Sequence, residues 1–154
     1  MSFSLTSPAF ADGERIPDRH ARGGDNVLPP LEWTEPPEEA ASFALIVDDP
    51  DAPNGTFTHA AILNIPSDRT TLEEGIDTQA EGDAFTYGTN SFGNAKYDGP
   101  EPPRGHGVHH YHFHLLALDV GHVEIEDEAE PGEVWDAVRG HVLAEAELVG
   151  TYER

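Results

Sequence analysis

The chain contains no cysteine among its 154 residues. It therefore has no disulfide framework and no thiolate metal site, which excludes the small disulfide-stabilised secreted folds and the cysteine-ligated zinc modules. Basic residues are also scarce: eight Lys and Arg face 30 Asp and Glu, and Lys96 is the only lysine. Because these few basic residues are scattered, the chain lacks the electrostatic footprint of a nucleic-acid-binding protein.

Long apolar runs are missing as well. No stretch approaches the roughly 20 apolar residues that a membrane-spanning helix requires. The N-terminal region also lacks the charged-then-apolar pattern of a secretory leader. We therefore expect no membrane insertion, no secretion and a cytoplasmic location.

Acidic residues dominate what is present, and the formal net charge is −22. Periodic apolar segments argue against disorder, so we interpret the chain as a folded protein with an acidic surface. Such a surface repels itself and destabilises the compact state at low ionic strength. The composition predicts a protein adapted to a salt-rich cytoplasm. Length and the lack of a linker predict a single domain over residues 1–154.

Apolar patterning predicts several strands and one helix. Residues 7–42 are rich in proline and glycine and are expected to form an irregular but ordered wrap. Residues 67–84 are expected to form a surface loop or a short helix, and residues 87–108 a loop. The periodicity favours a helix over 131–147, where Val134, Val138 and Val142 share a stripe. Many short strands and one late helix indicate a mainly β architecture with a helix packed on a sheet. The expected strands are 3–5, 43–47, 59–65 and 109–119.

The histidine-rich stretch at 105–118, GHGVHHYHFHLLAL, organises the candidate chemistry. On a strand, alternate side chains point to opposite faces, so His109 and Tyr111 share one face and offer imidazole and phenol groups to one place. His59 opens an earlier strand, and the DDPDAP segment at 48–53 places proline-braced carboxylates at the end of another. A carboxylate there can orient a histidine by accepting its ring N–H.

The opposite face of the same stretch carries His110, His112 and His114. Histidines two apart on a strand can both bind zinc, but a site needs three or four ligands, and no further ligand pair lies at a diagnostic spacing. We therefore assign no metal site and leave a metal-binding role of this row open, beside the alternative of an ordinary half-exposed sheet face. Nucleophilic catalysis has little support, because there is no G-x-S-x-G elbow and Ser91 and Thr58 are candidates only by default.

Several blocks together resemble the phosphatidylethanolamine-binding protein family, also called Raf-kinase-inhibitor-like, in its bacterial and archaeal branch. The resemblance spans nearly the whole chain and is strongest in DPDAP followed by the G-x-H-x-Y block. The blocks are GDNVLPPLEW at 24–33, VDDPDAP at 47–53, HAAILNIP at 59–66, YGTNSFG at 87–93, YDGPEPPRGHGVHHYHFHLLALD at 97–119 and GHVLAEAELVGTY at 140–152.

This resemblance implies a mainly β fold with flanking α, in which a central antiparallel sheet carries a smaller sheet on one side and a C-terminal helix on the other. It also implies a small pocket for anions such as phosphate, including phospholipid head groups. The Ala52–Pro53 bond is expected to be cis, as is common in the family. By position, the pocket is expected to be lined by Asp49, Asp51, Pro53, His59, Gly107, His109 and Tyr111.

Four positions depart from the usual family pattern. Ala60 stands where Trp is frequent, His110 where Arg is frequent, Ser91 where Asp is common, and Leu28 where Ser is common. The loss of Trp is expected to widen the pocket mouth, and the loss of Arg to remove a structural ion pair.

The expected function is binding of a small anionic or phosphorylated ligand, with regulation of a partner protein as its use. No cofactor is expected, and the protein is expected to be a monomer or homodimer. Two alternatives stay open: a hydrolase that uses the same pocket for acid–base chemistry, and a kinase or protease inhibitor that acts through loops at the pocket mouth.

Overall fold

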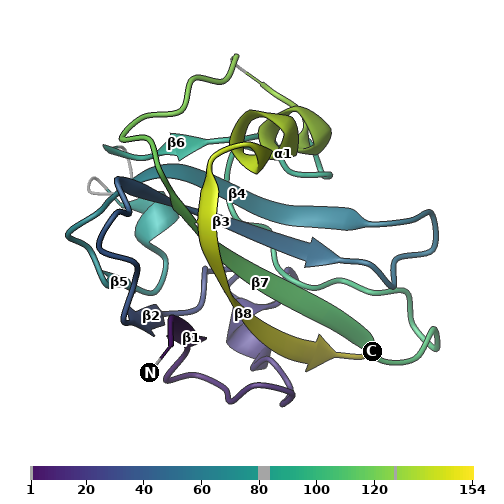
Figure 1. Ribbon diagram of the computed structural model, residues 1–154. Helices are drawn as coiled ribbons and strands as arrows, with labels where there is room; N and C mark the ends of the chain where they lie inside the picture. Colours follow the sequence, from purple (N-terminus) through teal and green to yellow (C-terminus); the bar gives the residue numbers. More distant parts are fainter. Residues whose placement is uncertain (1, 80–83, 127) are drawn as a thin grey trace.

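Two antiparallel sheets and one helix make up the fold in the computed structural model, which describes residues 2–79, 84–126 and 128–154 (Figure 1). The larger sheet has the strand order β6-β4-β3-β7-β8, and the smaller one has the order β1-β2-β5. The strands are β1 (Ser4–Thr6), β2 (Leu31–Thr34), β3 (Ser42–Asp49), β4 (Phe57–Pro66), β5 (Thr71–Leu72), β6 (Thr86–Tyr87), β7 (His109–Leu118) and β8 (Val142–Tyr152). The helix is α1 (Pro131–Arg139), and two 3-10 turns are η1 (Asp18–His20) and η2 (Ile76–Thr78).

Strand β3 lies at the centre of the larger sheet, and all eight of its residues are buried. Its run from Phe43 to Val47 is uninterrupted apolar sequence, as a strand covered on both faces requires. The expected strands at 43–47 and 59–65 are thus confirmed, with β3 and β4 each extending a few residues beyond them.

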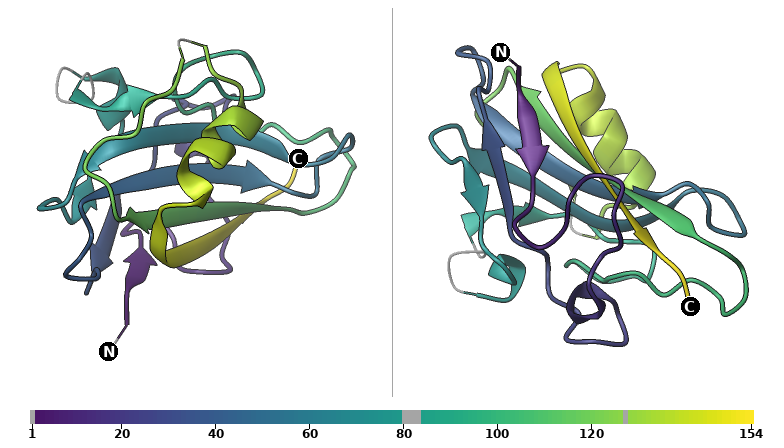
Figure 2. Two further views of the ribbon diagram at one scale, coloured as in Figure 1. Left: turned by 45° about the horizontal axis from the view of Figure 1, so that its top comes forward. Right: turned by 90° about the horizontal axis from the view of Figure 1, so that it is seen from below.

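Each face of the larger sheet carries its own apolar core. On one face the smaller sheet packs through Trp33, whose ring meets that of Phe43 edge-on at 5.4 Å. On the other face α1 packs across the larger sheet (Figure 2). Its Val134 and Val138 join buried residues of β3, β4 and β7 in one apolar cluster. The arrangement confirms a mainly β fold with a central sheet, a smaller sheet on one side and a helix on the other.

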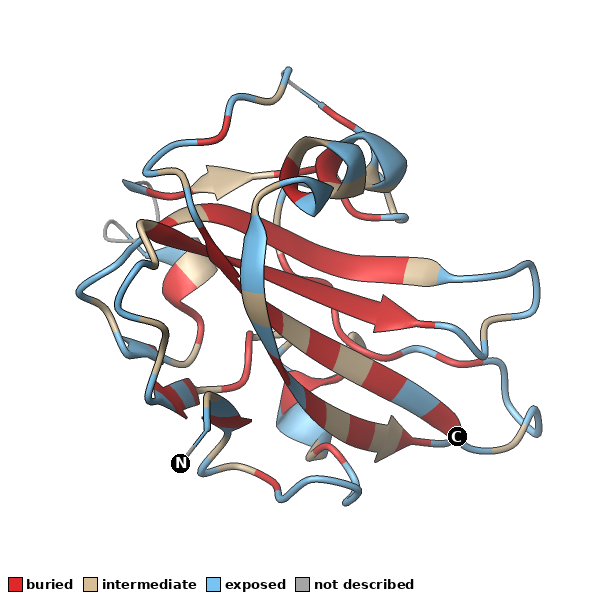
Figure 3. Cartoon of the chain, in the orientation of Figure 1, coloured by how far each residue is buried: buried red, intermediate tan, exposed pale blue. Residues whose placement is uncertain are grey.

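Burial alternates along the N-terminal half of strand β7, which faces both sides of the sheet (Figure 3). His109, Tyr111, Phe113 and Leu115 are buried on the side of the smaller sheet, and His110, His112 and His114 are exposed or half-buried on the other side. The alternation predicted from the sequence is confirmed, and it assigns the two sets of histidines to different environments.

The helix expected over 131–147 is wrong beyond its first half. α1 ends at Arg139, and the chain turns at Gly140 into β8, which pairs with β7 along the whole edge of the sheet. Val142 and Ala146 fit a period of about four, but from Ala146 onward every second residue is buried, as in a strand. Ladder hydrogen bonds to an otherwise open edge strand decide between the two patterns.

The remaining connections are largely irregular, as expected, although they contain β2, β5, β6 and the two 3-10 turns. The wrap over residues 7–42 is well ordered because Phe10, Ile16 and Leu28 are buried within it. Residues 80–83, part of the loop or short helix expected at 67–84, lie outside the described chain. Within the described residues, no helix has the length and apolar character to cross a bilayer.

Candidate functional site

A pocket opens where three neighbouring strands have their ends. Because β3 runs antiparallel to β4 and β7, its C-terminal end lies beside their N-terminal ends, with Asp49 opposite Phe57 and Asp48 opposite His112. The cavity is about 270 Å³, at the lower limit of common ligand pockets. Its lining residues are Asp49, Ala52, Pro53, Asn54, Gly55, Thr56, Phe57, His59, Phe92, Glu101, Pro102, Pro103, His109 and Tyr111.

A β-bulge brings His59 into this pocket. Val47 pairs with Ala60 and Asp48 pairs with Thr58, so His59 has no partner residue on β3. Such an extra residue re-aims a side chain and is frequent next to functional sites. The register shift turns His59 toward the pocket, while the hydroxyl of Thr58 donates to the carboxylate of Asp48 at 3.1 Å.

The imidazole of His59 is held on its Nδ1 side. Nδ1 lies 2.7 Å from the backbone carbonyl oxygen of Asp98, which can only accept, so Nδ1 carries the proton and Nε2 is the nitrogen available to a ligand. The ring contacts Tyr111 edge-on at 5.1 Å and also meets the rings of Phe57 and Phe92. Burial lowers the pKa of His59, and the opposing effects of the Asp98 and Gly99 carbonyls and of the nearby carboxylates do not offset it.

A chain of short hydrogen bonds runs from Asp49 through His109 to His106. Nδ1 of His109 lies 2.6 Å from Oδ2 of Asp49, and Nε2 of His109 lies 2.6 Å from Nδ1 of His106. With an ionised Asp49, the consistent proton arrangement has His106 donating to His109 and His109 donating to the carboxylate. Asp49 also accepts the backbone N–H of Asp51 at 2.8 Å and a hydrogen bond from the Tyr111 phenol.

The phenol of Tyr111 remains protonated across the physiological range. Burial and the adjacent Asp49 carboxylate raise its pKa well above the usual value, because both disfavour a phenolate. Its single O–H is directed to the Asp49 carboxylate, so the phenol helps to hold Asp49 at the pocket wall.

Asp98 braces the site from behind. Burial by itself would raise its pKa, but hydrogen bonds from Asn94, Asn26, Asn90 and Lys96 outweigh this effect and lower the pKa to about 2. The side chain is only 4% exposed. This fixed carboxylate anchors the segment whose carbonyl holds His59.

Neither lysine nor arginine lines the pocket among the described residues. The lining carboxylates are those of Asp49 and Glu101, and both have partners: Asp49 accepts from His109, and Glu101 accepts from Arg22 at 3.0 Å. The Asn54 amide and the Thr56 hydroxyl are neutral donors of the lining, while the Tyr111 hydroxyl donates to Asp49. Because both nitrogens of His109 are engaged, the site presents Nε2 of His59 and the neutral donors of Asn54 and Thr56 to a ligand.

The structure brings together most of the residues named from the sequence. Five of them, Asp49, Pro53, His59, His109 and Tyr111, line the pocket. Asp51 and Gly107 do not. The carboxylate of Asp51 instead accepts the backbone N–H and the ring nitrogen of His110, each at 2.8 Å, and Gly107 lies in the loop before β7 with a φ of +95°.

Sequence reasoning missed His106, Phe92, Phe57 and Glu101 as parts of the site. His106 had a visible signal, because it stands between Gly105 and Gly107, both with positive φ. The two phenylalanines and Glu101 carried no such signal, since only the folded loops bring them to the pocket.

The expected cis bond at Ala52–Pro53 is wrong, since no cis peptide bond occurs in the described chain. A turn reverses the loop instead: the N–H of Gly55 donates to the carbonyl of Ala52 at 3.2 Å, with Pro53 in the second position and Gly55 at a φ of +105°. A trans proline suits that position of a turn.

The departures from the family pattern also have local explanations. Ala60 is fully buried in the core, and His110 pairs with Asp51. The hydroxyl of Ser91 accepts the backbone N–H of Thr58 at 2.9 Å. Neither Ser91 nor Thr58 lines the pocket, which leaves both default nucleophiles away from His59 and His109.

A match to the family model described as phosphatidylethanolamine-binding protein covers residues 6–153. The chain belongs to the phosphatidylethanolamine-binding protein family. Its relatives include a UPF0098 protein of Methanothermobacter thermautotrophicus, 47% identical over 98% of this chain and 99% of the relative. A putative lipoprotein LppC of Mycobacterium tuberculosis is 39% identical over 97% of this chain and 72% of the relative.

Solved structures agree with this family assignment. The E. coli protein YbcL, described as a new member of the mammalian PEBP family, superimposes with a TM-score of 0.94 at 30% identity over 100% of this chain and 99% of its own. The Chlamydia trachomatis homologue CT736 gives a TM-score of 0.86 at 35% identity, covering 99% of this chain and 98% of its own. The phosphatidylethanolamine-binding protein fold is thus shared across the full length.

Proposed function

We propose that the pocket at the end of the central sheet binds a small phosphate-bearing ligand as a singly protonated group. The observation that carries the proposal is the fixed tautomer of His59, whose Nδ1 donates to the Asp98 carbonyl and whose pKa is lowered by burial. A neutral imidazole held in this way offers Nε2 as an acceptor. A ligand that meets it must therefore carry a proton.

A phosphate monoanion fits this combination of groups. Its P–O–H can donate to Nε2 of His59, while its other oxygens accept from the neutral donors of the mouth loop, Asn54 and Thr56. A carboxylate ligand lacks the proton at neutral pH and leaves Nε2 unpaired, which is costly at a buried site. The small cavity volume favours a single phosphate-sized head group.

The acidic surface does not prevent anion binding if the surrounding salt is concentrated. At about 1 M salt the Debye length is only about 3 Å, so distant carboxylates are largely screened. The two carboxylates that line the pocket have local hydrogen-bond partners. Short-range donors therefore decide the affinity.

Calorimetric titration with inorganic phosphate in molar KCl tests the proposal. We expect saturable binding at one site per chain, lost in His59→Gln and in His109→Ala and retained in the matched control His141→Gln, whose ring pairs with Asp119 far from the pocket. The proposal fails if phosphate does not bind or if His59→Gln binds as well as the parent. Hydrolysis of a chromogenic phosphate ester that His109→Ala abolishes would replace the binding role with a hydrolytic one.

A further inference from the structure

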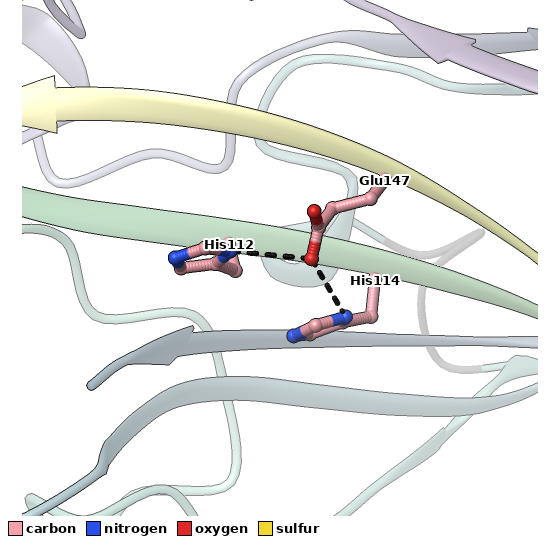
Figure 4. A group of neighbouring side chains, drawn as sticks. All are labelled: His112, His114 and Glu147. Carbon is pink, nitrogen blue, oxygen red and sulfur yellow. Dashed lines mark hydrogen bonds and ion pairs between the residues drawn. The ribbon is translucent and has the colours of Figure 1, made fainter. Parts of the chain in front are cut away.

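A second cluster of polar side chains lies on the opposite face of the sheet from the pocket. His112 and His114 project from β7 toward Glu147 of β8, which stands directly opposite His114 in the ladder (Figure 4). None of these residues belongs to the phosphate-sized pocket. One ligand atom from each, two imidazole nitrogens and one carboxylate oxygen, lie within 4.8 Å of one another.

The distances resemble the edges of a metal coordination shell. Oε2 of Glu147 lies 3.2 Å from Nδ1 of His112 and 3.4 Å from Nδ1 of His114. In a tetrahedral site with metal–ligand bonds of about 2.0–2.1 Å, neighbouring ligand atoms lie about 3.3–3.4 Å apart. Two of the three distances between ligand atoms thus already have the required length. The rings of His112 and His114 are stacked, and both residues are held on the same strand.

Surplus negative charge surrounds the two imidazoles. Nδ1 of His114 also lies 2.9 Å from Oε2 of Glu145, and its Nε2 lies 3.7 Å from Oδ2 of the buried Asp48. The single N–H at Nδ1 of His114 cannot donate fully to both Glu145 and Glu147, whereas a cation between these two carboxylates can interact with both. Asp48 stands where an outer carboxylate would orient a metal-bound histidine through its second nitrogen.

A hollow of about 230 Å³ adjoins the cluster and is lined by Asp48, Pro50, Thr56, His112 and His114. It gives room for a water molecule or a ligand group at an open coordination position. The net charge of −22 also raises the local concentration of cations at the surface.

We propose that His112, His114 and Glu147 form a binding site for a divalent transition metal such as Zn²⁺, with one coordination position open toward this hollow. Two histidines and one carboxylate are a ligand set of zinc sites that keep an open position. Imidazole ligands also favour zinc, nickel or copper over magnesium and calcium. None of the three proposed ligand residues lines the phosphate-sized pocket, although Thr56 lines both cavities, so either proposal can fail without the other.

Titration of tag-free, EDTA-treated protein with ZnCl₂ in buffered molar KCl tests the proposal. We expect one Zn²⁺ per chain and a higher Tm with the metal bound. His114→Gln and Glu147→Gln should lose this 1:1 binding, and the exposed position of Glu147 makes the second variant safe for folding. The matched control is His141→Gln, which removes a surface histidine paired with a single carboxylate and should bind as the parent does.

Trp135 supplies an independent local readout, because its ring meets that of His114 edge-on at 5.6 Å. Paramagnetic Co²⁺ or Ni²⁺ should quench its fluorescence in the parent protein and not in His114→Gln. Trp135→Phe should lose the signal while keeping the calorimetric binding. Weak multi-site binding that excess Mg²⁺ displaces equally from all variants, or 1:1 binding that survives His114→Gln, would overturn the proposal.

Discussion

The ring of His59 donates its Nδ1 proton to the carbonyl oxygen of Asp98 at 2.7 Å. This hydrogen bond connects a pocket residue to a buried residue whose carboxylate accepts several hydrogen bonds. In the proposed binding mode His59 sets the proton requirement of the ligand, and Asp98 holds the neighbouring segment in place. Both roles lead to measurable pH effects, which differ in sign and in pH range.

Phosphate binding should weaken as pH rises from about 5.5 to 8, the range in which a phosphate monoester loses its second proton. Burial lowers the pKa of His59, so the ring is neutral over most of this range and the ligand must supply the bridging proton. Calorimetry at a series of pH values measures the effect.

Sulfate is the matched control ligand, because it has the size of phosphate but no proton near neutral pH. It should bind far more weakly than phosphate at pH about 7. Equal affinity for the two anions, or a phosphate affinity that does not change with pH, would contradict the bridging-proton arrangement.

Asp98→Asn should destabilise the protein at neutral pH. The pKa of Asp98 is lowered to about 2 from an ordinary value of 3.8. Because the folded-state pKa is depressed, the stabilisation is fully present above the unfolded value and is lost as pH falls through the folded one. The shift corresponds to a free energy on the order of 2 kcal/mol.

Urea denaturation of parent and variant at several pH values tests this expectation. The difference in unfolding free energy should be largest above pH about 5 and should shrink toward pH about 2. The control Asp68→Asn alters an exposed carboxylate and should show little difference. If the difference in unfolding free energy between parent and Asp98→Asn stays constant with pH, the lost charge is not the cause of the destabilisation.

Gly150→Ala should overpack the core beneath the N-terminal wrap. A Cβ at position 150 would lie 2.5 Å from Cγ1 of Ile16 and 2.8 Å from Cε2 of Phe10. Overpacking of this kind costs about 1–3 kcal/mol. The control is Gly140→Ala, where a Cβ meets nothing within 4 Å, and chemical denaturation of both variants should show a loss only at Gly150.

Thermal stability should rise from dilute buffer to molar KCl. The net charge of −22 opposes the compact state, and the Debye length falls from about 10 Å at 0.1 M to about 3 Å at 1 M salt. For a domain of this size, each kcal/mol gained raises Tm by roughly 2–4 °C. A Tm that is flat or decreasing across a KCl series would refute adaptation to salt.

The sequence was informative wherever one strong pattern stood without a competitor. The alternation of His109 to Leu118 required a strand with two different faces, and the apolar run before Asp48 required a central one. In the last segment two patterns competed, because Val142 and Ala146 fit both helical and strand spacing. Pairing with the edge of β7, which is a long-range interaction, makes this segment a strand.

The site was predictable in its chemistry but not in its exact membership. His59, His109 and Tyr111 were recognisable as residue types at strand ends, while the bulge that turns His59 into the pocket depends on the register with β3. His106 joined the site through a ring contact at the end of a glycine-flanked loop. Glu147 is a partner of His112 and His114 because it lies on β8, in a segment that the sequence predicted to be helix.

Strand β7 contributes to both sites: His109 and Tyr111 on one of its faces line the phosphate-sized pocket, and His112 and His114 on the other face belong to the second cluster. Point substitutions can therefore alter either chemistry alone. An insertion or deletion of one residue within β7 would exchange the two sets, sending His112 and His114 inward and Phe113 outward. Natural variation in this strand should accordingly proceed by replacement and not by change of length.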